Sequence, residues 1–138
     1  MTHRTRFAAS AAMALMSLAS PPALRAQPAV DSPQRVEIKR VDLDRAPGIE
    51  VVVSTAEYKP GETLPTHFHH GLEVAYILQG ATVQIPGQPA RALPTGASVL
   101  NQRGIRHAGF TVVGETSLKL FTVHIVDKGA PLFDHSVR

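Results

Sequence analysis

The sequence predicts an all-β fold, a sandwich or barrel of antiparallel strands. Short segments rich in β-branched residues recur between evenly spaced turns, and 11 prolines and 10 glycines supply those turns. No segment of helical length shows the 3.6-residue period of an amphipathic helix. The hydrophobic fraction of 43% is that of a globular chain, and 138 residues allow one domain.

Residues 1–26 are predicted to be a secretory signal peptide. They have a positively charged start that includes Arg4 and Arg6, an apolar centre over about residues 7–19, a Pro-Pro break, and the small residue Ala26 at the cleavage position. The apolar run is shorter than the roughly 20 residues of a spanning helix. We therefore expect a periplasmic or secreted protein with no stable membrane insertion.

The net charge of +3 depends on this segment, because without it 11 basic residues balance 11 acidic ones. The remaining chain has no basic excess, no tryptophan and only six other aromatic residues, so nucleic-acid binding is not expected. The absence of cysteine excludes disulfides, thiolate ligands, a cysteine nucleophile and a lipidated cysteine. We expect a small-molecule ligand or substrate instead.

The strands can be assigned in order. Residues 27–34 hold two prolines and no apolar period, and we interpret them as a flexible lead-in to a single domain over 35–138. β-branched residues indicate the first two strands, apolar–polar alternation indicates the third, and Gly80 and a Pro-Gly-Gln-Pro turn separate the later ones. The strands are predicted over 36–41, 49–53, 73–79, 82–85, 97–100, 107–113 and 117–126.

The last predicted strand has two distinct faces. One carries Lys119, which favours solvent or a partner subunit. The opposite face carries Thr122 and His124, which we expect to point into the interior and contact substrate.

Three histidines fall within four residues. His67 and His69 are two apart and therefore point to the same side of an extended segment, whereas His70 should point away, to the rim. A bend at Gly71 would bring Glu73 to the same point. Two imidazoles and a carboxylate suit a divalent first-row metal, and burying them without a cation would be costly.

These residues resemble a known family. Gly61, five residues, His67-Phe68-His69, three residues, Glu73, six residues and Gly80 match the first cupin motif at every spacing. Gly96, Gly104 and His107 match the second cupin motif, which here has Gln102 in place of proline and Thr111 in place of asparagine. The match covers about half of the chain without its signal peptide. The chain is therefore identified as resembling a small single-domain cupin.

The resemblance implies an antiparallel double-stranded β-helix, a jelly-roll barrel of six to eight strands. It also implies one divalent transition metal (Fe, Mn, Cu, Ni or Zn) held by His67, His69, Glu73 and His107. From the residues alone, His107 and His124 are equal candidates for the last ligand. This shell leaves coordination positions open, as in catalytic sites.

Polar residues beside His107 are candidates for substrate binding. We predict that Gln102 and Arg106 lie at the barrel mouth, where an arginine such as Arg106 or Arg103 can hold a carboxylate. His135 is expected in a flexible tail.

Three functions fit this site. The first is a dioxygenase-like metal-dependent oxidoreductase acting on a small organic substrate, with Glu73 as an additional proton acceptor. The second is a non-redox metal lyase or isomerase. The third is a module that binds or senses a small molecule or metal without turnover. A homodimer is also expected, because a small barrel exposes sheet edges.

Overall fold

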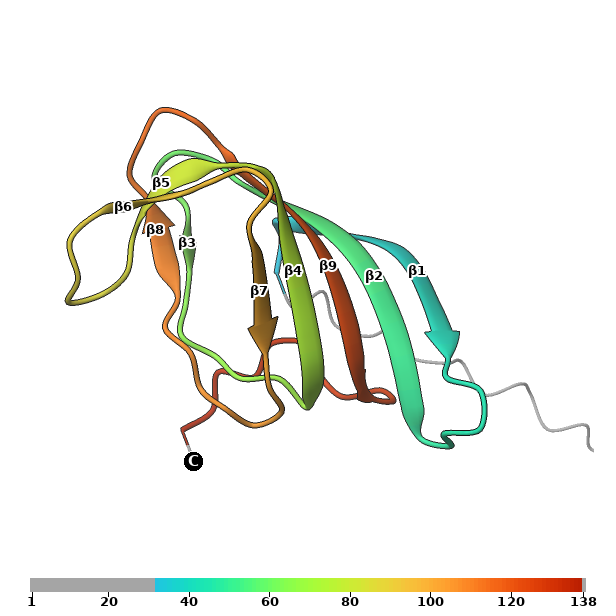
Figure 1. The fold of residues 1–138 in the computed structure, drawn as a ribbon. Helices are drawn as coiled ribbons and strands as arrows, with labels where there is room; N and C mark the ends of the chain where they lie inside the picture. The colour runs from blue at the N-terminus through green and yellow to red at the C-terminus, as the bar shows by residue number, and fades with distance from the viewer. Residues whose placement is uncertain (1–31, 138) are drawn as a thin grey trace, which may run out of the picture.

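The computed structural model describes residues 32–137, which form two antiparallel sheets curled around a shared interior (Figure 1). These residues contain no helix, and so none that could span a membrane. The strands are β1 (Arg35–Asp42), β2 (Ile49–Tyr58), β3 (Thr63–Leu64), β4 (Gly71–Gln79), β5 (Ala81–Gln84), β6 (Arg91–Leu93), β7 (Ser98–Asn101), β8 (Phe110–Val112) and β9 (Leu118–Asp127).

The topology is that of a double-stranded β-helix, and the predicted fold class is confirmed. One sheet has the order β1-β2-β9-β4-β7 and the other β3-β8-β5-β6. The last strand, β9, lies between β2 and β4 and pairs antiparallel with both. Residues far apart in the sequence therefore meet at the centre of the larger sheet (Figure 1).

The predicted strands are present with changed ends. The structure adds the two short strands β3 and β6, which are too brief for their period to be recognised, and so has nine strands in the described region rather than six to eight. The strand predicted over 107–113 begins only at Phe110. Its first residue, His107, instead forms an isolated bridge with His67.

Alternation along β4 separates a buried inner face from an exposed outer one. Glu73, Ala75 and Ile77 are buried, whereas Tyr76 and Leu78 are 45% and 48% exposed. Ile77 joins a hydrophobic cluster from both sheets, which supplies hydrophobic free energy of folding. The buried members of that cluster are Ala56, Tyr58, Ile77, Ala81, Val83, Val112 and Leu118.

Contacts with the larger sheet begin before residue 35. Gln34 O accepts a hydrogen bond from Glu57 N at 3.1 Å, and Ser32 is buried. The remainder of the predicted lead-in and the predicted signal peptide lie outside the described residues. The edge strand β1 exposes Val36 and Ile38 at 64% and 59%. The homodimer stays a prediction.

Gly71 is required where β4 crosses β9. A Cβ atom at this position would lie 2.0 Å from the backbone oxygen of Ile125 and 2.6 Å from the Cα of Val126. The sequence pattern suggested a bend at this glycine, but the structure assigns it a second role, the close approach of two strands. This approach sets Glu73, two residues later, beside His124 of β9.

We predict that Gly71→Ala lowers the free energy of unfolding by about 2 kcal/mol or more, because the added methyl group forces β4 away from β9. Urea denaturation monitored by circular dichroism measures this loss. Gly114→Ala is the matched control, since the nearest atom to a Cβ there is a side-chain carbon of Thr82 at 3.2 Å. Equal stability losses in the two variants would contradict the assigned role of Gly71.

Candidate metal centre

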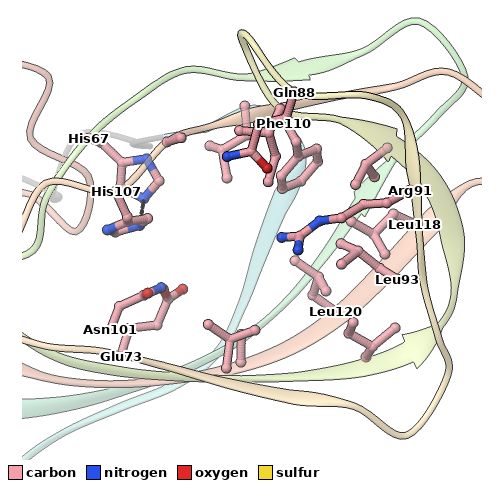
Figure 2. A pocket seen from close by; sticks show the side chains of 17 residues that line it. His67, Glu73, Gln88, Arg91, Leu93, Asn101, His107, Phe110, Leu118 and Leu120 are labelled. Carbon is pink, nitrogen blue, oxygen red and sulfur yellow. Dashed lines mark hydrogen bonds between the residues drawn. The ribbon is translucent and has the colours of Figure 1, made fainter.

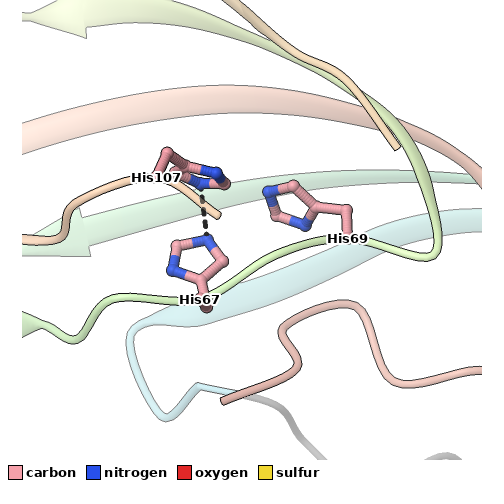
Figure 3. Close-up of side chains that lie close together, drawn as sticks. All are labelled: His67, His69 and His107. Atoms are coloured by element: carbon pink, nitrogen blue, oxygen red, sulfur yellow. Dashed lines mark hydrogen bonds between the residues drawn. The ribbon is translucent and has the colours of Figure 1, made fainter. Parts of the chain in front are cut away.

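Five side chains capable of binding a metal converge in the interior. His67 and His69 come from the segment between β3 and β4, and Glu73 from β4. His107 precedes β8, and His124 lies on β9. All but His107, which is half-buried, are buried. Figure 3 shows the rings of His67, His69 and His107 facing a common centre.

Backbone pairing places these side chains. His107 N donates to His67 O at 3.0 Å, which sets the two rings opposite each other. Glu73 stands directly across from His124 in the β4–β9 register and from Asn101 in the β4–β7 register. Residues in register share a sheet face, so the row His124–Glu73–Asn101 points inwards as a unit.

The orientation of three rings is fixed by backbone carbonyls. The Nδ1 atoms of His67, His69 and His107 lie 2.8, 2.6 and 3.3 Å from the carbonyl oxygens of Pro65, Leu132 and Ile105 respectively. Because a carbonyl oxygen only accepts, each of these Nδ1 atoms carries a proton. In a neutral ring of this kind Nε2 presents its lone pair, as in histidines that bind metals.

The Nε2 atoms lie close to one another and to the Glu73 carboxylate. The Nε2 atoms of His67 and His107 are 3.0 Å apart, and His69 Nε2 lies 3.0 Å from Glu73 Oε2. His124 Nε2 lies 3.3 Å from Glu73 Oε1. Within the described region, His69 Nε2 and both ring nitrogens of His124 are buried without a hydrogen-bond partner. Such a cluster is costly unless a cation occupies its centre.

Within each of two triads, the donor atoms are spaced closely enough to share a metal ion. Ligands at bond lengths of about 2.1 Å and angles near 90° lie about 3.0 Å apart, as these atoms do. Two overlapping triads have all their ligand atoms within 4.8 Å of one another, His67–His69–His107 and His69–Glu73–His124. The cluster can therefore hold a metal ion. All four ligands implied by the sequence resemblance lie in it, and His124 joins them.

The electrostatics favour the protonation states that metals bind. Burial lowers the pKa of His67 to about 4 and also lowers the pKa of His107, so both rings are neutral near pH 7. Burial would raise the pKa of the Glu73 carboxyl, but the rings of His124 and His69 outweigh it and hold that pKa well below its usual range.

Asn101 was not identified from the sequence. Its Nδ2 donates to Glu73 Oε2 at 2.6 Å and orients the carboxylate. A lone asparagine at the end of a short strand carries no local signal. Only its register opposite Glu73 identifies it.

The cluster forms one end of a cavity of about 310 Å³ between the two sheets. His67, Glu73, Asn101 and His107 line that end, and aliphatic residues of both sheets line most of the remainder (Figure 2). The volume suits a small organic molecule.

The predicted substrate-binding residues are dispersed. Thr122 and His124 are buried on the inner face of β9, as its alternation indicated. Gln102 lines a separate shallow pocket with Ile105 and His107, not the large cavity. Arg106 donates to the backbone oxygen of Ser136 and does not line the cavity either. Arg103 likewise forms a bidentate pair with Asp127.

The segment after β9 packs against the metal centre. Phe133 is buried, and its ring centroid lies 4.6 Å from that of His67 and 5.5 Å from that of His69. Asp134 forms a bridge with Phe68 and also contacts His70 Nε2 at 2.8 Å. The expectation of a free tail is therefore wrong for His135, whose Nδ1 donates to Thr66 O at 3.1 Å.

A model of the cupin domain matches residues 54–124, just over half of the chain, and the chain therefore belongs to the cupin family. No curated protein matches it. A double-stranded β-helix protein of Klebsiella pneumoniae is 14% identical, with a TM-score of 0.56 over 80% of this chain and 90% of that one.

Two enzymes of known structure are also similar to this chain. Polyketide cyclase RemF of Streptomyces resistomycificus is 21% identical, with a TM-score of 0.50 over 64% of this chain. DMSP lyase DddQ of Ruegeria pomeroyi is 20% identical, with a TM-score of 0.47 over 58% of this chain. The matches span 62% and 40% of those enzymes. Identities this low indicate the fold alone.

We predict that Phe133→Ala lowers the free energy of unfolding by about 3 kcal/mol, because it removes a buried ring. It should also weaken binding of Zn²⁺, because His67 and His69 lose the surface that orients them. Denaturation in EDTA and calorimetric titration with Zn²⁺ measure the two effects.

The control is Phe121→Ala, because Phe121 is half-buried on the face of β9 opposite to His124. It should cost less stability and leave zinc affinity unchanged. Unaltered zinc affinity in Phe133→Ala would contradict the role assigned to the segment after β9.

Proposed function

We propose that this protein is a metal-dependent enzyme, of dioxygenase type, that acts on a small organic molecule. The observation that carries the proposal is the cluster of buried histidine nitrogens and a carboxylate at one end of a mostly apolar cavity. A purely structural metal site would need no cavity leading to it.

The chain's own residues supply the holding and orienting functions. His67, His69, Glu73, His107 and His124 are the candidate ligands, and the carbonyls of Pro65, Leu132 and Ile105 fix three of the rings. A bound metal would supply Lewis acidity or one-electron exchange. The aliphatic walls would bind the apolar part of a substrate and exclude water from the site.

The donor set favours an oxygenase over the alternatives. His69, His124 and Glu73 form a two-histidine, one-carboxylate triad, which is typical of non-haem iron oxygenases. Because its pKa lies well below the usual range, Glu73 is a weak proton acceptor, and we propose it as a ligand rather than a base. The non-redox lyase or isomerase and the binding module remain the alternatives that experiment separates.

His69→Ala should abolish metal binding, because His69 belongs to both triads. Elemental analysis of the purified protein measures bound metal. Thermal unfolding provides a second measure, since metal at 100 times its Kd stabilises a folded protein by about 2.7 kcal/mol. We expect that gain in the unsubstituted protein and none in the variant.

His70→Ala is the matched control, because the His70 ring contacts Asp134 and belongs to neither triad. It should retain the metal and the gain in stability. Full metal content in His69→Ala would defeat the ligand assignment.

The reaction class can be tested by incubating the protein with a mixture of small aromatic and aliphatic metabolites and following each compound by mass spectrometry. The three conditions are Fe²⁺ in air, Fe²⁺ under nitrogen, and Zn²⁺ in air. We expect consumption of a compound only with Fe²⁺ in air.

Equal consumption under nitrogen and with Zn²⁺ would contradict the oxygenase proposal and favour a lyase or isomerase. Binding of a compound with no consumption in any condition would favour a binding module.

A further inference from the structure

The end of the cavity opposite the metal centre carries a positive charge. Arg91, the first residue of β6, and Gln88, in the turn between β5 and β6, both line the cavity there. Figure 2 shows the Arg91 guanidinium directed into the cavity, with His67 and His107 on the far side. Gln88 and Arg91 are exposed residues, so this end is open to solvent.

The guanidinium of Arg91 has no hydrogen-bond or ion-pair partner among residues 32–137. Other arginines of the domain are engaged. Arg103 pairs with Asp127 at 2.7 and 2.8 Å, Arg40 pairs with Glu37 and Glu50, and Arg106 donates to Ser136. An arginine held over aliphatic walls without an anion presents its donors to whatever enters the cavity.

The charges around the cavity do not neutralise Arg91. Glu73 is the one carboxylate among the described lining residues, and it lies at the closed end, hydrogen-bonded to Asn101 at 2.6 Å. Leu93, Leu118 and Leu120 stand beside Arg91 in Figure 2 and offer it no acceptor. The open end therefore favours an anion, and a divalent metal at the closed end would increase that preference.

We propose that Arg91 binds the carboxylate of a small substrate with an apolar body, which spans the cavity and presents its other end to the metal centre. The planar fork of the guanidinium matches a carboxylate in two parallel hydrogen bonds. The Gln88 side chain is placed to add a third. Arg91 is the single permanent cation among the described lining residues, which suits a monoanion better than a phosphate dianion.

This assignment rests on the proposed function in one respect only, namely that the end of the ligand away from Arg91 meets the metal centre. The sequence suggested that Arg106 binds a substrate carboxylate. We assign that role to Arg91, which no sequence pattern identified. The role of Arg91 and the role of the metal centre can be tested separately, because in this proposal they bind opposite ends of the ligand.

The test is calorimetric titration of the full chain with benzoate, hexanoate and 3-phenylpropanoate, each against its own carboxamide. The titrations are made on EDTA-treated protein and on protein loaded with Zn²⁺. We expect at least one acid to bind at least about tenfold more tightly than its amide in the metal-free protein, as charge-assisted hydrogen bonds predict. Arg91→Gln should remove that preference, and Arg91→Lys should restore part of it.

Arg45→Gln is the control for net charge, because the Arg45 side chain is 92% exposed in the β1–β2 connection. It should keep the preference for the acid over the amide.

A preference that survives in Arg91→Gln would overturn the proposal, as would the absence of a preference for any of the three acids. A preference seen only with Zn²⁺ and unchanged in Arg91→Gln would place the carboxylate on the metal, overturning the role of Arg91 but not the proposed function. A preference that depends on Arg91 in a protein that binds no metal would support the anion site and defeat the metal proposal.

Discussion

The structure depends on one constraint, the burial of lone pairs that face one another. Backbone carbonyls hold the protons of His67, His69 and His107 on Nδ1, which leaves Nε2 of each ring as an acceptor directed at the interior. Glu73 adds an ionised carboxylate to the same space. Ring nitrogens and a carboxylate gathered at 3.0 Å in a buried site are stabilised by a cation among them, and a metal ion is the cation that we propose.

The fold provides this arrangement through long-range pairing. β9 places His124 beside Glu73, the bridge between His67 and His107 joins segments 40 residues apart, and the segment after β9 covers the rings with Phe133. The cavity separates two electrostatic environments, because the candidate metal ligands lie at one end and Arg91 lies at the other. A molecule that binds there would be aligned between the two.

The local part of this account could be predicted from the sequence. The His67-x-His69 spacing and the following Glu73 identify the first ligands, and the alternation of the last strand predicted that Thr122 and His124 face inwards. Asn101, Phe133 and Arg91 could not be found in this way, because their roles come from register and from contacts between distant segments. Arg106 was assigned to the mouth by its proximity to His107 in sequence, but it binds Ser136 instead.

Anomalous X-ray scattering from crystals of the protein loaded with Zn²⁺ tests the central claim most directly. The account predicts one strong peak, at bonding distance of about 2.0–2.1 Å from the Nε2 of His69 and in contact with members of both triads. Absence of a peak, or a peak outside this cluster with the His67 and His107 rings turned away from each other, would contradict it.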